Sequence, residues 1–280
     1  MRIVRPFRYE LAAYCRHLFG PRSTAVRALI FAQGRSGTTL LENLLCSSGH
    51  FTRNGEVLRG ERLHILFPNA FLEGLARKRP HDNFICHVKP GHIDQDRQDV
   101  SARPIDLRRF LETLSSRGWR IIHLYREDKL RQYLSAEMGK ARGSFHKFDD
   151  QPEEYRIIAN RDQFAAGLAA LIECDRRERA ALASIPHVEV QYETDLESSG
   201  AHQVTVDRVL DYLGLERRPV ATRLRKINYR PIAEIVENYD AFAAWSHELG
   251  AGAWLKRAVA DPTTRPFERP GERGRPADDP

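Results

Sequence analysis

A glycine-rich turn between an apolar run and a helical pattern most constrains what this chain can fold into. Residues 28–32 form a short apolar run that suits a buried strand. The turn Gly34-Arg35-Ser36-Gly37-Thr38-Thr39 follows, and residues 39–45 then place leucines at helical spacing. A strand, a glycine turn and a helix in this order bring curled backbone amides and a helix N-terminus together, where an anion binds.

Three more apolar runs extend this pattern along the chain. We predict strands over residues 83–88, 120–125 and 188–192, and helices over residues 107–114, 161–182 and 204–213. Strands that alternate with helices indicate an α/β fold, with a parallel sheet between two layers of helices. Such sheets bind ligands beyond the carboxyl ends of their strands, which is where the glycine turn lies.

Composition excludes several other classes of protein. The chain has 280 residues, of which 41% are hydrophobic and 29% are charged, an ordinary globular balance. No apolar stretch approaches the ~20 residues of a membrane span, and charges interrupt every apolar run near the N-terminus. The four cysteines are far apart and have no zinc-ligand spacing. We therefore expect a cytoplasmic protein without a metal site.

The formal charge of +6 is concentrated at one end of the chain. Residues 1–28 hold six arginines and one acidic residue, whereas the main body is nearly balanced, so we predict no nucleic-acid partner. Leu11, Tyr14, Cys15 and Leu18 predict a short amphipathic helix that packs on the domain, with weak contact to the inner face of a membrane as the alternative. The expected organisation is a basic N-terminal segment (1–27), one main domain (28–260) and a disordered, Pro/Arg-rich tail (261–280), in an unknown oligomeric state.

The glycine turn departs from the phosphate loop of ATP- and GTP-binding enzymes. That loop requires GxxxxGK[ST], and aligning Gly37 with its second glycine puts Thr38 at the lysine and Ala32 at the first glycine. No predicted strand ends in a plain aspartate that could hold magnesium. A P-loop kinase is therefore the alternative, not the main hypothesis. A nucleotide-binding protein without activity is a second alternative.

The glycine turn that differs from the ATP- and GTP-binding loop resembles the loop of another family. The segment GRSGTTLL resembles the 5'-phosphosulfate loop of sulfotransferases that use 3'-phosphoadenosine 5'-phosphosulfate (PAPS). Residues 121–126, followed by Ser135, resemble the 3'-phosphate motif of the same family. Residues 190–196 and 209–215 are similar to the family's stretch near the adenine pocket. The three motifs occur in the family's order over about residues 28–215.

Finer features resemble the bacterial carbohydrate sulfotransferases. Residues 52–58 are similar to a segment of the Nod-factor enzymes, and residues 126–132 look like a run in the trehalose sulfotransferase group. Arg225-Lys226, residues 230–232 and residues 238–239 resemble the C-terminal basic loop and following helix of the Nod-factor enzymes. The resemblance implies a P-loop-like three-layer fold, PAPS as co-substrate, no required metal, and a carbohydrate or glycolipid acceptor.

The resemblance also implies roles for single residues. Those expected to hold the nucleotide are Arg35, Ser36, Gly37, Thr38 and Thr39 at the 5'-phosphate, Arg126 and Ser135 at the 3'-phosphate, Tyr192 at the adenine, and Arg225 and Lys226 over the 3'-phosphate. Simpler alternatives stay open: a solvated strand-end charge for Arg126, a core tyrosine for Tyr192, and a solvated basic face for Arg225 and Lys226.

An acceptor hydroxyl needs a general base within hydrogen-bond reach. By resemblance to the trehalose group, Glu56 is the expected base, and we expect burial to raise its pKa towards neutrality. His92, and after it His87, are the rival bases. Lys89 follows the second predicted strand and is expected, together with Arg35, to stabilise charge on the transferred group.

Overall fold

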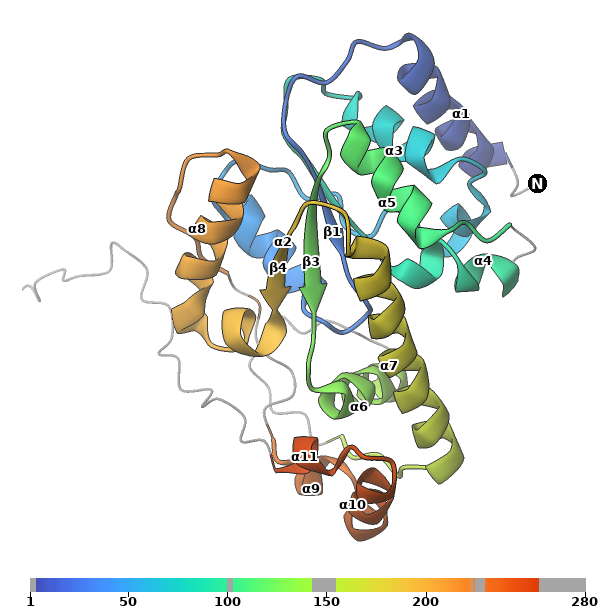
Figure 1. The fold of residues 1–280 in the computed structure, drawn as a ribbon, viewed down its shortest axis with the longest axis vertical. Coiled ribbons are helices and arrows are strands. Elements are labelled where there is room, and N and C mark those ends of the chain that lie inside the picture. The colour runs from blue at the N-terminus through green and yellow to red at the C-terminus, as the bar shows by residue number, and fades with distance from the viewer. Residues whose placement is uncertain (1–3, 100–102, 143–154, 223, 225–229, 257–280) are drawn as a thin grey trace, which may run out of the picture.

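The computed structural model describes residues 4–99, 103–142, 155–222, 224 and 230–256. The strands are β1 (Arg27–Phe31), β2 (Phe84–Val88), β3 (Arg120–Tyr125) and β4 (His187–Gln191). The helices are α1 (Val4–Phe19), α2 (Thr38–Ser47), α3 (Pro68–Ala76), α4 (Gln95–Asp99), α5 (Leu107–Ser116), α6 (Lys129–Arg142), α7 (Arg161–Leu182), α8 (His202–Leu213), α9 (Ile232–Ile235), α10 (Tyr239–Glu248) and α11 (Gly252–Leu255) (Figure 1).

The strands form one parallel sheet in the order β2-β1-β3-β4. The predicted α/β fold and all four predicted strands are confirmed. β4 begins and ends one residue earlier than predicted, so Tyr192 opens the helical turn Tyr192–Leu196 instead of ending the strand. Because all strands run the same way, their carboxyl ends meet at one edge of the sheet.

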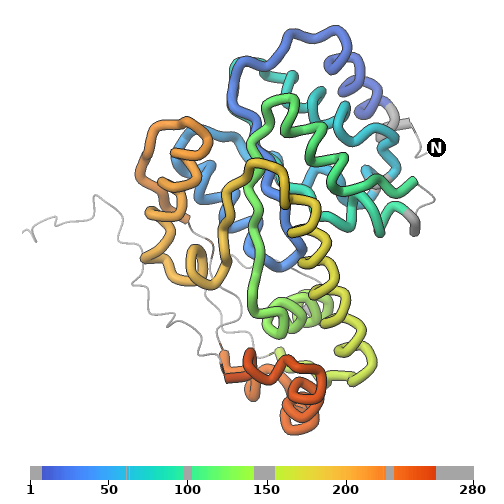
Figure 2. The backbone as a smooth tube through the Cα atoms, viewed as in Figure 1, coloured from blue at the N-terminus to red at the C-terminus, as the bar shows by residue number. Residues whose placement is uncertain are grey.

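Helices cover both faces of the sheet, and the three layers are visible in the ribbon and the tube (Figures 1 and 2). Alternate strand residues explain this arrangement, since successive side chains point to opposite faces. Ile30 and Ile122 pack with leucines and valines of α2 and α8 on one face. Leu29 and Ile121 pack with α3, α5 and the end of α7 on the other.

A third hydrophobic cluster lies beyond the carboxyl edge of the sheet. It joins α6 and the first turns of α7 to α9, α10 and α11, with Phe164 and Phe242 at its centre. The two rings lie 4.6 Å apart between centroids. This cluster gives α6 a firm base on the side away from the sheet, so residues of α6 can face the carboxyl edge.

The predicted N-terminal helix exists as α1 and packs on the domain, but of its predicted apolar stripe only Tyr14 packs against the core. Leu11, Cys15 and Leu18 are exposed, whereas Ala13 is fully buried against α3. A Cβ added at Gly74 of α3 would lie 1.9 Å from the Ala13 carbonyl oxygen, so the two helices touch backbone to backbone. Small residues on both sides allow that approach.

Polar contacts complete the attachment of α1. The Glu10 carboxylate accepts from the Leu66 amide at 3.0 Å, and the Tyr14 hydroxyl accepts from the Phe67 amide at 2.9 Å. The Arg16 guanidinium donates to the Gly74 carbonyl at 2.9 Å. Within the part of the chain that the structure describes, no helix is both long enough and apolar enough to span a membrane.

The contact between α1 and α3 leads to a first prediction. In Gly74→Ala the new methyl group would overlap the Ala13 backbone, so α1 must shift, and we expect a loss of about 1–3 kcal/mol in the free energy of unfolding. Gly200→Ala is the matched control, because its Cβ meets nothing closer than 3.6 Å. Urea denaturation measures both variants. Equal stabilities of the two variants would show that α1 does not pack on α3 in this way.

Candidate active site

The predicted site residues follow the carboxyl ends of neighbouring strands. The glycine turn follows β1, Lys89 follows β2, Arg126 follows β3 and Tyr192 follows β4. Since the strands are parallel and adjacent, these four points lie along one edge of the sheet. The topology therefore gathers segments that are far apart in the sequence.

The turn between β1 and α2 has an unusual backbone. Arg35 has a φ of 65° and Gly37 a φ of 101°, both in the left-handed region. A non-glycine residue adopts that region at a cost of roughly 1–2 kcal/mol, so the surrounding structure must hold Arg35 there. The Gln132 amide donates to the Gly34 carbonyl at 2.8 Å, and the Ser36 hydroxyl donates to the Gln33 carbonyl at 2.7 Å.

The serine and threonines of the turn do not cap the helix. Gly37 occupies the N-cap of α2, and no side chain accepts a hydrogen bond from the first helical amides there, as far as the described residues show. The Ser36 side chain is fully buried, and its hydroxyl is used inside the turn. Thr38 and Thr39 open the helix and line the cavity described below. The uncapped amides and the two threonines make an anion cradle.

Glu56 lies on a segment that runs beside β2. The His87 amide donates to the Gly55 carbonyl at 3.0 Å, and the Val57 amide donates to the His87 carbonyl at 3.4 Å, so this segment pairs with the strand. The pairing carries Glu56 to the carboxyl end of β2, beside Lys89 and His92.

A buried carboxylate on α2 holds this segment in place, and sequence analysis missed it. Glu42 is fully buried and accepts from the Asn54 amide at 3.1 Å and the Gly55 amide at 2.6 Å. It also pairs with Arg53 at 3.2 Å. Because α2 begins in the glycine turn, Glu42 ties the position of Glu56 to that turn. The sequence signal was present: a lone glutamate among the leucines of an otherwise apolar helix face.

Glu56 has two partners at the cavity wall. Its Oε1 lies 2.9 Å from Lys89 Nζ and 3.1 Å from His92 Nε2. The Lys89 side chain also passes close to the glycine turn, since a Cβ at Gly34 would lie 3.5 Å from Lys89 Cε. One carboxylate, one ammonium and one imidazole therefore meet beside the anion cradle.

The expected rise in the pKa of Glu56 is wrong, because the charged groups around it lower that pKa. Burial raises the pKa of its carboxyl, but the Lys89 charge, the Lys89 hydrogen bond and the nearby histidines outweigh burial and hold the pKa below its ordinary value. Burial lowers the pKa of His92 and of His87. Glu56 is thus ionised and His92 neutral at pH 7, and either group is in a form that can accept a proton.

Arg126 lies directly beneath the glycine turn. Its guanidinium is buried, donates to the Arg35 carbonyl at 3.4 Å and pairs with Glu193 at 3.4 Å. The solvated strand-end alternative for Arg126 is therefore wrong. Arg35 in turn donates to the Ser135 hydroxyl at 2.9 Å, so the structure brings together the three polar side chains expected around the nucleotide phosphates.

Tyr192 closes the other side of the turn. Arg126 lies 4.7 Å from the centroid of the Tyr192 ring, and a Cβ at Gly37 would lie 2.7 Å from the same ring. The tyrosine also packs against the core on the α2 face, and burial raises its pKa. It thus contacts both the turn and Arg126. Arg225 and Lys226 lie outside the described residues.

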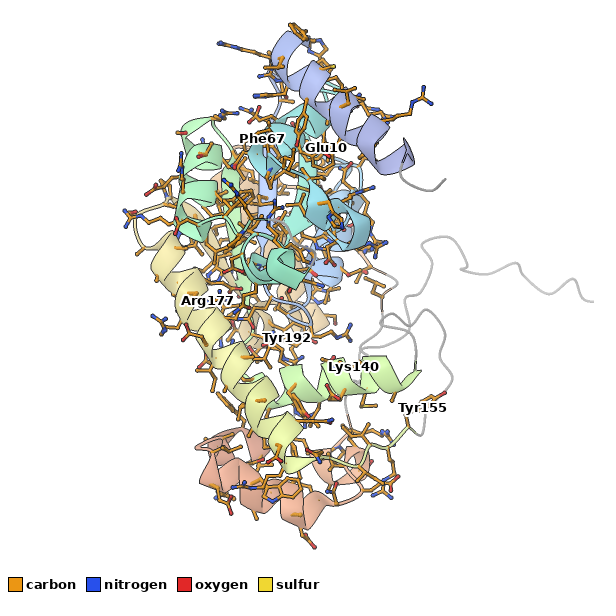
Figure 3. All side chains as sticks on the ribbon, turned by 90° about the vertical axis from the view of Figure 1, so that its right-hand side faces the viewer. Glu10, Phe67, Lys140, Tyr155, Arg177 and Tyr192 are labelled. Atoms are coloured by element: carbon orange, nitrogen blue, oxygen red, sulfur yellow. The ribbon has the colours of Figure 1, made fainter. Side chains whose placement is uncertain are left out.

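A cavity of about 1790 Å³ opens beside these groups. Its inner wall holds Arg35, Thr38, Thr39, Glu56, Lys89 and His92. Its outer walls include Glu10 on α1 and Lys140 on α6, which lie towards opposite ends of the molecule in Figure 3. A pocket for a single small ligand usually has ~300–1,000 Å³, so this cavity has room for two ligands side by side.

Comparison with known proteins carries little weight for this chain. A scan against protein-family models found no match, and a search of the curated proteins found none either. Among solved structures, retinol dehydratase in a complex with retinol and PAP is similar with a TM-score of 0.38 and 14% identity. The match covers 77% of this chain and 66% of that chain. At this identity and TM-score, the function of the present chain must be judged on its own site.

The buried Glu42 leads to a second prediction. In Glu42→Gln an NH2 group replaces one acceptor oxygen and leaves a buried donor against other donors, so we expect a loss of about 1–3 kcal/mol in the free energy of unfolding. Amide hydrogen exchange at residues 54 and 55 should accelerate at the same time. The exposed Glu216→Gln is the matched control. Unchanged exchange at both amides would contradict the positioning role of Glu42.

Proposed function

We propose that this chain is a sulfotransferase that moves a sulfuryl group from PAPS to a hydroxyl of a carbohydrate or glycolipid. One observation carries the proposal: the glycine turn, Arg126, Ser135, Lys89 and Glu56 meet at one edge of the sheet, beside one large cavity. Such a site can bind a nucleotide phosphate and place a base next to it. PAPS transfer also fits the motif resemblance of the sequence.

The nucleotide side is supported by the cradle and its arginines. A 5'-phosphate would accept from the uncapped amides of α2 and from Thr38 and Thr39. Arg126 and Ser135 meet Arg35 at the turn, where they would hold the 3'-phosphate that distinguishes PAPS from ADP-like nucleotides. A nucleoside triphosphate is the less suitable ligand, because Thr38 occupies the position of the phosphate-loop lysine.

The reaction side is supported by the Glu56 group. In an in-line transfer, the S–O bond to the acceptor oxygen forms while the S–O bond to the 5'-phosphate breaks. Glu56 takes the hydroxyl proton, and the electron pair of the broken bond stays on the leaving phosphate oxygen. Lys89 lies between Glu56 and the glycine turn, so its ammonium neutralises negative charge on the transferred group and the leaving oxygen.

The outer part of the cavity supports an acceptor with both polar and apolar surfaces. Tyr9, Tyr14 and Phe71 line it together with Arg59 and Arg62. Aromatic faces and forked donors side by side suit a sugar ring with its hydroxyl groups. Residues 57–82 and 136–160 both contribute described residues to the lining of the cavity.

The direct test is incubation of the purified chain with ³⁵S-labelled PAPS and carbohydrate or glycolipid extracts. Label transfer to a hydroxyl-bearing product supports the proposal. ATP with magnesium serves as the comparison donor, and phosphoryl transfer from it without any sulfuryl transfer would move the function to the kinase class.

A third prediction concerns the 3'-phosphate. Arg126→Ala removes a charged donor from the turn, so we expect binding of 3',5'-adenosine bisphosphate to weaken by about 10–100-fold, and binding of AMP far less. Calorimetry measures both ligands. Arg161→Ala removes an exposed arginine and is the control variant. Equal losses for both nucleotides would take the 3'-phosphate role away from Arg126.

A fourth prediction concerns the base. Glu56→Gln should lower kcat by about 10²–10⁴-fold and leave PAPS affinity nearly intact. Because the folded pKa of Glu56 lies below its usual 4.5, the carboxylate stays ionised as pH falls, and kcat/KM should hold from pH 8 to about pH 5.5. A fall within that range that disappears in His92→Gln would give the base role to His92.

A further inference from the structure

A second group of polar side chains lies on the sheet, apart from the large cavity. His123 of β3 pairs in register with Glu189 of β4, and His187 precedes Glu189 by two residues on the same strand. Residues two apart on a strand share a face, so all three side chains lie on the side of the sheet that α7 covers. One donor atom from each falls within 4.8 Å of the others.

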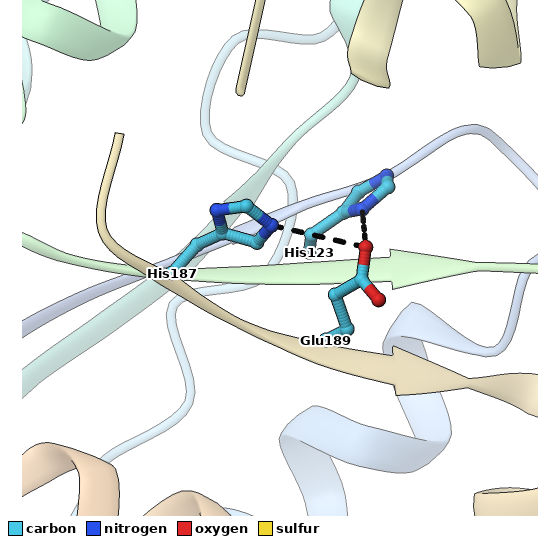
Figure 4. Close-up of side chains that lie close together, drawn as sticks. All are labelled: His123, His187 and Glu189. Atoms are coloured by element: carbon cyan, nitrogen blue, oxygen red, sulfur yellow. Dashed lines mark ion pairs between the residues drawn. The ribbon is translucent and has the colours of Figure 1, made fainter. Parts of the chain in front are cut away.

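Both histidines turn a ring nitrogen to the same carboxylate oxygen (Figure 4). His123 Nδ1 and His187 Nε2 each lie 3.8 Å from Glu189 Oε1. That distance is too long for a hydrogen bond, so these three atoms do not satisfy one another. His123 is fully buried, and its Nδ1 has no hydrogen-bond partner among the described residues. A buried polar atom without a partner calls for an explanation.

The contacts of the other two ring nitrogens, His187 Nδ1 and His123 Nε2, indicate which nitrogen of each histidine has a lone pair directed at Glu189. His187 Nδ1 lies 2.7 Å from the Ile185 carbonyl, which can only accept, so Nδ1 carries the proton and Nε2 keeps its lone pair. His123 Nε2 lies 3.2 Å from the carboxyl group of the buried Glu178, so a neutral ring that donates from Nε2 presents an unprotonated Nδ1 to the site. Histidines that bind metals are held in this way, through a carbonyl or carboxylate on the opposite nitrogen.

We propose that His123, His187 and Glu189 form a binding site for a divalent transition-metal ion of the zinc class. Two imidazole nitrogens and one carboxylate oxygen are a common zinc ligand set, and a water molecule fills the fourth position. Tetrahedral zinc with bonds of ~2.0–2.1 Å separates its ligands by about 3.3 Å, so the two 3.8 Å distances to Glu189 need to shorten by about 0.5 Å, and the third pair, which lies within 4.8 Å, must also close on binding. This site is independent of the proposed sulfuryl transfer.

Charge and access also suit a cation. Glu189 supplies a carboxylate at the site, and the carboxyl group of Glu178 lies behind His123 at 3.2 Å from its Nε2. The competing cation is Arg179, which is 4.0 Å from Glu189 but makes its shorter contact, 2.9 Å, with Asp175. The side chain of Glu189 is 50% exposed and that of His187 is 20% exposed, so an ion can enter from solvent.

The bound ion would join the edge strand β4 to β3. β4 leads directly into Tyr192, which contacts Arg126 and the glycine turn. An ion at this point would therefore hold the strand that positions one wall of the nucleotide site. Its expected contribution is structural, because none of its ligands lines the large cavity.

The experiment uses the full chain without a histidine tag, freed of metal by a chelator. Co²⁺ is titrated and followed by visible absorption, and Zn²⁺ is titrated in competition with a coloured chelator. We expect one equivalent to bind, with the d–d bands of a tetrahedral site and no thiolate charge-transfer band. His187→Ala and Glu189→Gln should each weaken binding at least tenfold, whereas the exposed His81→Ala should not.

Zinc should also raise the Tm of the wild-type chain and leave that of Glu189→Gln unchanged, which reports binding without any activity assay. Circular dichroism checks that each variant is folded. Less than one equivalent bound by the wild-type chain, a thiolate band, or wild-type affinity in both ligand variants would overturn the proposal. None of these outcomes depends on PAPS, so failure of the metal site and failure of the proposed sulfuryl transfer are separate results.

Discussion

The left-handed backbone of the turn between β1 and α2 is the constraint on which the rest of the site depends. Gly37 adopts this backbone freely, whereas Arg35 does so at a cost that neighbouring contacts must offset. Gln132 of α6 donates to the Gly34 carbonyl, and the Tyr192 ring fills the space beside Gly37. The turn is therefore also a junction, and the ends of β3 and β4 are fixed by their contact with it. A looser turn would disperse the arginines that meet there.

Paired burial of charge is the second organising feature. Burying a charge without a partner is costly, so buried ions come with counter-ions or several hydrogen bonds. Arg126 has Glu193, and Lys129 has Asp175 at 2.9 Å. Glu42 has two backbone amides and an arginine. These pairs lie around the carboxyl edge of the sheet, so the elements that carry the candidate active site are held together by electrostatic contacts with defined geometry.

Sequence patterns predicted the sheet and the location of the site, because both depend on local signals. Apolar runs of five or six residues between helical patterns could only be buried strands, and a glycine turn after the first of them fixed the binding edge. The predicted stripe of α1 matches the buried face only at Tyr14, because the contact between Ala13 and Gly74 depends on a partner helix that the sequence does not reveal. The pKa of Glu56 is lowered and not raised as expected, because Lys89 and His92, which follow a different segment of the chain, lie beside its carboxylate in the fold.

Contacts between segments that are far apart in the sequence explain why two polar clusters were not predicted. His123 and His187 are far apart in the chain and have no ligand spacing, yet the β3–β4 register places both beside Glu189. The role of Glu42 depends on the segment at Asn54 and Gly55, whose backbone amides donate to its carboxylate in the folded chain. Polar clusters of this kind arise from register and topology, which hydrophobic periodicity does not encode.

The attachment of α1 has a consequence for how this site can change. The helix borders the outer end of the cavity and is held to α3 and the segment before it by hydrogen bonds, the contact between Ala13 and Gly74 and the aromatic pair Tyr9–Phe71, outside the junction formed by Arg35, Gly37 and Tyr192. Replacement of Tyr9 or Leu11 therefore alters the outer wall without disturbing the glycine turn or Glu56. The outer wall of the cavity and the group at the sheet edge can therefore be changed separately by substitution.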